Sequence, residues 1–164
     1  EVLDEIGPWL PLINEEDWEY DCRVASLIRP LAYVPAYVSD TRYTDDTLSS
    51  GSTSDVAKMR DRARAHIAIL THAMRAGIDY GAPELSHFAK ELFLLSRQCG
   101  SVGLSEEAEA LAQASRACGS ISGSYDLKLR CYQMLALVVG WERLGTLSCR
   151  VDCMLQQSPF RTSS

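Results

Sequence analysis

The stretch that decides the fold class is "SDVAKMRDRARAHIAILTHAMRAG", residues 54–77. Its apolar residues recur every three or four positions, the spacing that places side chains on one face of an α-helix. We expect Ser54 to cap this helix and Gly77 to end it. The apolar residues are Val56, Met59, Ala63, Ile67, Leu70 and Met74.

The chain after this stretch shows the same helical period. Pro83 is suited to a first helical position, and an apolar stripe follows it. Ser105 is followed by two glutamates, which favour a helix start. We therefore expect helices at residues 83–100, 105–119, 125–144 and 146–156, with Gly145 as a break, and a flexible tail at 158–164.

Two of these helices resemble a tetratricopeptide hairpin in the run "LFLLSRQCGSVGLSEEAEALAQASRA", residues 92–117. Gly103, Ala108 and Ser115 are small residues where two helices would approach closely. No second copy follows at a fixed period. The sequence therefore predicts a bundle of helical hairpins rather than a long solenoid, with its apolar stripes buried in the core.

Charge separates the first third of the chain from the rest. The chain has 164 residues and a net charge of −6, and residues 1–54 contain eleven acids against three arginines. Neither part is basic enough to indicate a nucleic-acid surface. No window reaches eighteen consecutive apolar residues, so we expect a soluble, globular protein. The opening residues contain no signal peptide, and we expect the chain to be a fragment of a longer protein.

Cysteine and histidine give no metal signal. The six cysteines include no C-x-x-C pair, and we expect reduced, buried thiols, the alternative being a disulfide or metal framework. His66, His72 and His87 lack the spacing of metal ligands, and we expect them at the surface or partly packed on helices.

The densest acidic cluster is "NEEDWEYDCRVASL", residues 14–27. In one interpretation Asn14 caps a helix over residues 15–28, and the acids simply stabilise its first turn through the helix dipole. In the other, a carboxylate held beside aromatic groups serves as a general base. The dipole lowers the pKa of such a base, so this second interpretation requires burial or a neighbouring acid such as Glu16.

The segment that follows the acidic helix predicts a different local structure. We expect a break at Pro30, a short strand at residues 31–38 that Pro35 restricts, and a loop at residues 40–55.

The run from Leu3 to Gly51 resembles the C-terminal end of the catalytic domain in family 2 nucleotide-sugar glycosyltransferases, inverting enzymes of the GT-A fold. Four elements carry the resemblance in order. They are Ile6-Gly7, Glu16-Asp17 with Trp18 and Arg23, Tyr33-Val34-Pro35, and Arg42 with Ser49 and Ser50.

This resemblance implies a site. Asp17 would be the general base that deprotonates an acceptor hydroxyl, and Glu16 its supporting acid. Trp18 would line the acceptor or sugar pocket, or pack against the helix start. Arg42 would contact the diphosphate. The family's histidine two residues after this arginine is replaced by Thr44, which places a metal contact there in doubt.

The nucleotide-binding half with its D-x-D metal motif is absent from the sequence. We therefore expect Mn²⁺ or Mg²⁺ in a longer parent enzyme, and neither a metal nor activity in this chain alone.

The combined prediction is a mainly α fold. Residues 1–50 would be a helix and strand left over from a GT-A α/β catalytic domain, and residues 51–157 a helical bundle. The function would be sugar transfer from a nucleotide sugar to a glycan or lipid-linked acceptor, in bacterial polysaccharide or cell-surface glycan synthesis, in the cytoplasm or at the inner face of the membrane. The alternative is a helical module that binds a partner protein or self-associates, without catalysis.

Overall fold

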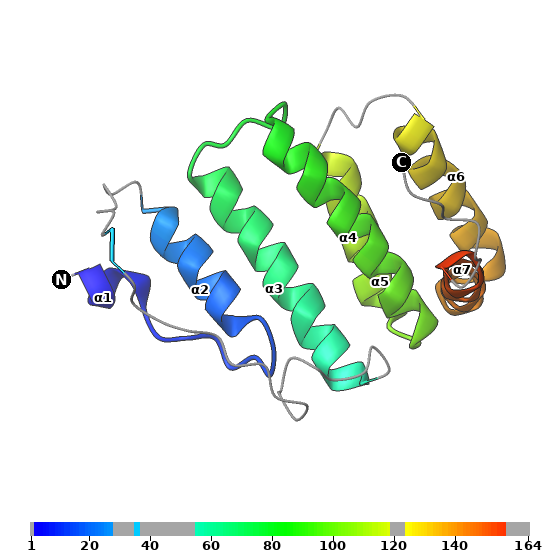
Figure 1. The fold of residues 1–164 in the computed structure, drawn as a ribbon, viewed down its shortest axis with the longest axis horizontal. Coiled ribbons are helices and arrows are strands. Elements are labelled where there is room, and N and C mark those ends of the chain that lie inside the picture. Colours follow the sequence, from blue (N-terminus) through cyan, green and yellow to red (C-terminus); the bar gives the residue numbers. More distant parts are fainter. Residues whose placement is uncertain (1, 28–34, 37–54, 119–123, 157–164) are drawn as a thin grey trace. The chain divides into compact units, whose positions relative to one another are not determined.

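A computed structural model describes residues 2–27, 35–36, 55–118 and 124–156, and in these residues it contains seven helices and no strand (Figure 1). The mainly α fold is thus confirmed. The chain divides into two compact units, residues 1–78 and 79–164. Unit 1 contains α1 (Val2–Ile6), α2 (Glu16–Ala25) and α3 (Val56–Arg75), and unit 2 contains α4 (Pro83–Ser101), α5 (Ser105–Ala117), α6 (Ser124–Val139) and α7 (Trp141–Gln156).

Unit 1 is built on the pairing of α2 with α3, which lie side by side in Figure 1. The cap of α3 is Asp55, whose carboxylate accepts hydrogen bonds from the amides of Ala57 and Lys58 at 3.0 and 3.2 Å. The prediction of Ser54 was wrong by one residue, because the carboxylate of Asp55 reaches both free amides. Gly77, with φ of 78°, follows the end of α3 as predicted.

The start of α2 also differs from the prediction. The cap position is Glu15 rather than Asn14, and no side chain caps the helix. Glu15 has a φ of 62°, so the chain enters α2 through a left-handed residue that is not glycine. The side chain of Glu15 points to α3 instead of to the amides of its own helix.

The expected strand at residues 31–38 finds no support. Only Pro35 and Ala36 of this segment are described, and neither is in a helix or strand. Pro30, the rest of the segment, the loop up to residue 54 and the tail at 158–164 lie outside the described residues.

In unit 2, α4 and α5 form the predicted hairpin, with Pro83 at the start of α4. Ala108 and Ser115 are fully buried between the helices, and the Ser115 hydroxyl donates a hydrogen bond of 2.7 Å to the carbonyl of Ala89. The expected close approach at these two residues is confirmed. Gly103 instead lies in the turn, where its φ of 82° favours glycine.

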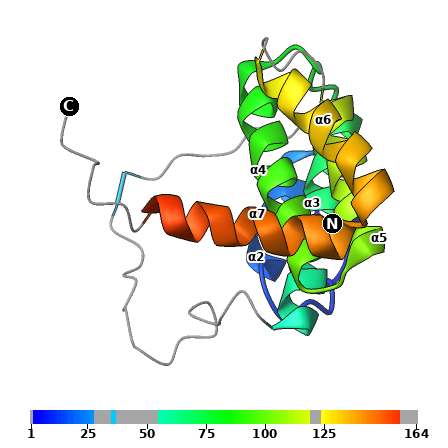
Figure 2. The same cartoon turned by 90° about the vertical axis from the view of Figure 1, so that its right-hand side faces the viewer.

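The second pair of helices, α6 and α7, breaks at a different glycine from the predicted one. Gly140, with φ of 93°, separates them, whereas Gly145 lies inside α7. There α7 crosses α4 (Figure 2). A Cβ atom on Gly145 would lie 2.4 Å from the Ser101 amide nitrogen, and one on Gly100 would lie 2.7 Å from the Trp141 carbonyl oxygen. The two backbones can approach this closely only because both residues are glycine.

The six cysteines are all free, but they are not all buried. Cys99 and Cys118 are buried as expected, whereas Cys131 and Cys153 are exposed. Both exposed thiols lie on α6 and α7, where apolar residues also face solvent. The most exposed of these are Leu127, Met134, Leu137, Val138 and Met154.

Candidate functional site

The acids around the start of α2 separate into two sets. Glu15 and Glu19 are one helical turn apart and face α3, whereas Asp17 and Asp21 are exposed. This separation follows from the helical period, since residues four apart share a face and residues two apart do not. The cluster therefore contains a structural set, Glu15 and Glu19, whose carboxylates contact α3, and a free set, whose side chains pair with no described cation.

Glu19 is the centre of the structural set and is only 1% exposed. Its Oε1 lies 2.8 Å from Nε2 of the buried His72, and its Oε2 accepts a hydrogen bond of 3.1 Å from Arg23. Arg23 also donates to the carbonyls of Ile6 and Pro8, at 2.9 and 3.0 Å. One buried carboxylate thus links α2 to α3 and, through Arg23, to the end of α1 and the residues that follow it.

Glu15 makes the second link to α3. Its Oε1 lies 2.8 Å from Nε of Arg62, and its Oε2 lies 3.0 Å from Nδ1 of the buried His66. His66 Nδ1 is also 3.0 Å from the Arg62 carbonyl, so its single hydrogen has two acceptors nearby. Oε2 of Glu15 and Nε of Arg62 make no hydrogen bond of acceptable geometry with any described residue. The contact between Glu15 and the Arg62–His66 pair is therefore an ion-pair contact by distance rather than a hydrogen bond.

Glu16, Asp17 and Trp18 form the free set, and they include three of the four residues that the sequence indicated. The Asp17 carboxylate accepts a hydrogen bond of 2.8 Å from the Trp18 amide. Among the described residues no cation pairs with Glu16 or Asp17. The Trp18 side chain is 57% exposed, and its ring meets His66 edge-on at 6.0 Å between centroids.

This arrangement leaves the Asp17 carboxylate open to a ligand but does not bury it. The described residues therefore provide direction and access for a base, and they provide an acidic neighbour, Glu16, rather than an apolar enclosure. Arg42 lies outside the described residues, as do Tyr33, Val34, Thr44 and the two serines.

Sequence reasoning missed the residues that fix this site in place. It treated His66 and His72 as surface or partly packed residues, and both are buried and within 3.0 Å of a glutamate. Two signals were available: the four-residue spacing of Glu15 and Glu19, and the same spacing of Arg62 and His66 on the next helix. Spacing alone does not reveal that Glu15 meets Arg62 and His66, or that Glu19 meets His72, which lies 53 residues further along the chain.

No metal site is formed by the parts of the chain that the structure describes, since no three of their His, Cys, Asp or Glu side chains could hold an ion together. Among the same residues, no helix combines the length and apolarity needed to cross a membrane.

The chain matches no protein-family model, no curated protein and no solved structure in the comparisons made.

Proposed function

We propose that this chain is the C-terminal part of an inverting glycosyltransferase, which transfers a sugar from a nucleotide sugar to an acceptor hydroxyl in the cytoplasm. The observation that supports the proposal is the free set at the start of α2. Glu16, Asp17 and Trp18 remain unpaired with any described cation, whereas Glu15 and Glu19 are engaged with α3. The type of reaction and the nucleotide-sugar donor are inferred from the resemblance of residues 3–51 to family 2 enzymes.

In the proposed reaction Asp17 takes the proton of the acceptor hydroxyl as that oxygen forms a bond to the anomeric carbon. The bond between this carbon and the diphosphate breaks at the same time, so the nucleoside diphosphate leaves with the electron pair and the configuration inverts. The Trp18 ring offers an exposed apolar surface for a sugar ring. Glu16 would be the supporting acid beside this base.

The structural set would position this base. A general base must be within hydrogen-bonding reach of the proton it removes, so the direction of α2 matters. Glu19, two residues after Asp17 on α2, ties this helix to His72 of α3. Arg23 of α2 donates to the carbonyls of Ile6 and Pro8 and so fixes the other side of the helix. Neither partner needs to touch the substrate for this role.

The other parts of the reaction belong to residues outside this structure. Arg42 would bind the diphosphate, and a divalent metal, Mn²⁺ or Mg²⁺, would neutralise the leaving group when bound in the nucleotide-binding half of the parent. The acceptor would be a glycan or a lipid-linked glycan at the inner face of the membrane. The chain alone should be inactive.

The test uses the chain extended at its amino end by its own coding frame. Release of nucleoside diphosphate is measured with a panel of nucleotide sugars in the presence of Mn²⁺ or Mg²⁺. Asp17→Asn should lower turnover by about 10²- to 10⁴-fold, the usual contribution of a general base. Asp21→Asn is the matched control, because Asp21 is an exposed acid one turn further along the same helix.

Retained turnover in Asp17→Asn, or an equal loss in Asp21→Asn, would contradict the assignment of the base. Circular dichroism of both variants should match the unchanged chain. If the extended chain releases no diphosphate from any donor, the acidic cluster is a helix start and no more.

A second candidate function is supported by α6. Leu127, Cys131, Met134 and Val138 are exposed and follow one another by four, three and four residues, the spacing of a coiled-coil seam. The opposite face packs Leu129 and Ala136 into unit 2. A helix that is apolar on both faces is typical of one that is covered by a partner, and we infer that the partner is the same seam on a second copy of the chain.

Sedimentation of the chain over a range of concentrations tests this candidate. A dimer that dissociates in Val138→Asp but persists in Leu147→Asp would support self-association through α6. Leu147 is a suitable control because it is exposed on α7, outside the seam. A monomer at every concentration would exclude it.

A further inference from the structure

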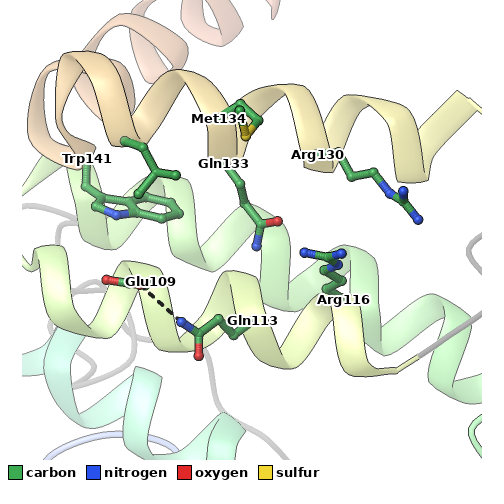
Figure 3. Close-up of a pocket in the computed structure, with 8 residues that line it drawn as sticks. Glu109, Gln113, Arg116, Arg130, Gln133, Met134 and Trp141 are labelled. Carbon is green, nitrogen blue, oxygen red and sulfur yellow. Dashed lines mark hydrogen bonds between the residues drawn. The ribbon is translucent and has the colours of Figure 1, made fainter.

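Unit 2 contains a groove of about 350 Å³ between α5 and α6, bounded at one end by the first residue of α7 (Figure 3). This volume is in the range of small-molecule sites, which are mainly apolar with a few polar groups at fixed places. The groove shows the same combination, and its polar and apolar groups are sorted along its length.

One end of the groove is apolar and aromatic. Trp141 is partly buried there, and Met134 and Leu137 of α6 lie along the same wall with 66% and 72% of their surface exposed. Such exposed apolar side chains lower the free energy when a hydrocarbon covers them, because apolar surface is removed from water.

The other end is basic. Arg116 of α5 and Arg130 of α6 extend from facing helices into the space between them (Figure 3). Arg130 uses its Nε to pair with Asp126 at 2.9 Å, which leaves its two terminal nitrogens, and no described carboxylate pairs with Arg116. An anion at this end would accept charge-assisted hydrogen bonds from Arg116 and from the two terminal nitrogens of Arg130.

The residues in the middle of the groove and at its apolar end determine which way round an anionic ligand would bind. Gln113 and Gln133 line it between the two ends, and Gln113 donates a hydrogen bond of 3.1 Å to Glu109. Figure 3 shows Glu109 at the same end as Trp141. The negative charge of Glu109 disfavours an anion at the apolar end, so an anionic group is directed to the two arginines.

We propose that this groove binds an amphiphile with an anionic head, a phosphate or a carboxylate, and a single linear hydrocarbon chain. The head lies between Arg116 and Arg130, and the chain runs over Met134 and Leu137 to Trp141. Arg130 and Leu137 are seven residues apart on α6, about 10 Å by the helical rise, which suits a chain of octyl to dodecyl length. The amphiphile is taken up as a monomer. This inference does not depend on the glycosyltransferase proposal, and it competes with a dimer through the α6 seam, because both would cover Met134.

The first experiment is calorimetric titration of the whole chain with dodecyl phosphate below its micellar concentration. Dodecanoate should also bind. Dodecyl maltoside, dodecyltrimethylammonium and inorganic phosphate should each bind at least tenfold more weakly, because each lacks either the anionic head or the chain. Equal binding of the anionic and the cationic amphiphile would overturn the proposal, as would the absence of dodecyl phosphate binding.

Variants locate the site. Arg116→Gln and Arg130→Gln should each weaken dodecyl phosphate about tenfold or more, since a hydrogen bond to a charged group is lost. Arg143→Gln is the matched control, an exposed arginine of α7 that does not line the groove, and it should bind normally. Glu109→Gln should bind at least as well as the unchanged chain. An equal loss in Arg143→Gln would place the binding elsewhere.

A second measurement reports on the chain end of the ligand. The sequence has three tryptophans, so Trp9→Phe with Trp18→Phe leaves Trp141 as the single emitter. Its fluorescence should shift to shorter wavelength on addition of dodecyl phosphate and stay unchanged with inorganic phosphate. Binding only to vesicles that contain phosphatidic acid, with no response to the monomer, would contradict uptake of a free amphiphile.

Discussion

The two units of this chain join their helices by opposite means. In unit 1, α2 and α3 are linked by buried charge, with Glu19 between His72 and Arg23. In unit 2, α4 and α7 are in contact through backbone, with Gly100 and Gly145 at the crossing. The difference shows that helix pairs in one chain can depend on specific partners in one place and on the absence of side chains in another.

The two kinds of contact should fail differently. A buried carboxylate that loses its partners leaves an uncompensated charge, which is expensive in a medium of low polarity. A glycine crossing fails by steric overlap, which the helices relieve by moving apart.

Glu19→Leu should lower the free energy of unfolding of unit 1 by about 3–5 kcal/mol, because it removes one member of a buried charged group and leaves His72 and Arg23 facing an apolar side chain. Chemical denaturation followed by circular dichroism measures the change. The double variant Glu19→Leu with His72→Leu should recover part of the loss. Asp21→Leu, an exposed acid on α2, is the control and should change little; an equal cost there would contradict the role of Glu19.

Gly145→Ala should destabilise unit 2 by about 1–3 kcal/mol through overpacking, although alanine is the better helix former in isolation. The added Cβ would lie 2.4 Å from the Ser101 amide nitrogen and 2.8 Å from the Arg97 carbonyl oxygen, and backbone atoms cannot rotate away. Gly81→Ala is the control, since its nearest neighbour would be 3.8 Å away. A stabilised Gly145→Ala would show that α4 and α7 do not cross here.

Ser115→Ala should cost about 1 kcal/mol, because the buried hydroxyl that bonds to the Ala89 carbonyl is lost from the α4–α5 contact. Thermal unfolding gives the difference. Ser86→Ala, on α4 without such a bond, is the reference. If the two variants unfold alike, the hydrogen bond contributes nothing to the hairpin.

Tyr125 should ionise late. Burial raises the pKa of its hydroxyl to about 12, an effect that Glu91 adds to and Arg97 opposes. Because the folded pKa exceeds the ordinary value of 10, its contribution to stability is complete below pH 10 and declines as the pH rises towards 12. Ultraviolet titration should lose a late step in Tyr125→Phe and keep it in the exposed Tyr80→Phe. A titration curve unchanged by Tyr125→Phe would contradict this.

The sequence predicted the helices better than it predicted their contacts. The period of apolar residues located α3, α4 and α5. On α3, however, the expected buried stripe was only partly right: Met59 and Ala63 are buried, whereas Val56 is 42% exposed and the buried face also contains Asp61, His66 and His72. The prediction from sequence placed the last helix break at Gly145 instead of Gly140. In a sequence, a glycine that ends a helix cannot be distinguished from a glycine at a helix crossing. Only the position of Gly100 on α4 distinguishes them.

The same limit applies to the candidate site. Glu16, Asp17 and Trp18 stand out locally, as an acidic turn beside an aromatic residue, and their catalytic role stays a prediction. Glu19 and His72 are ordinary residues in their own helices and become notable only where the two helices meet. A local pattern can therefore indicate the exposed acids and the aromatic residue of the candidate site. The contacts that hold α2 against α3 depend on the tertiary fold and leave no local pattern.

The left-handed backbone of Glu15 has an evolutionary consequence. A residue other than glycine costs about 1–3 kcal/mol in such a conformation, and the contacts of the Glu15 side chain with Arg62 and His66 offset this cost. In diverged sequences that share this fold, glutamate at position 15 should therefore occur together with Arg62 and His66. Where that pair has been replaced, glycine or asparagine should take over position 15, and this covariation would record the contact between α2 and α3.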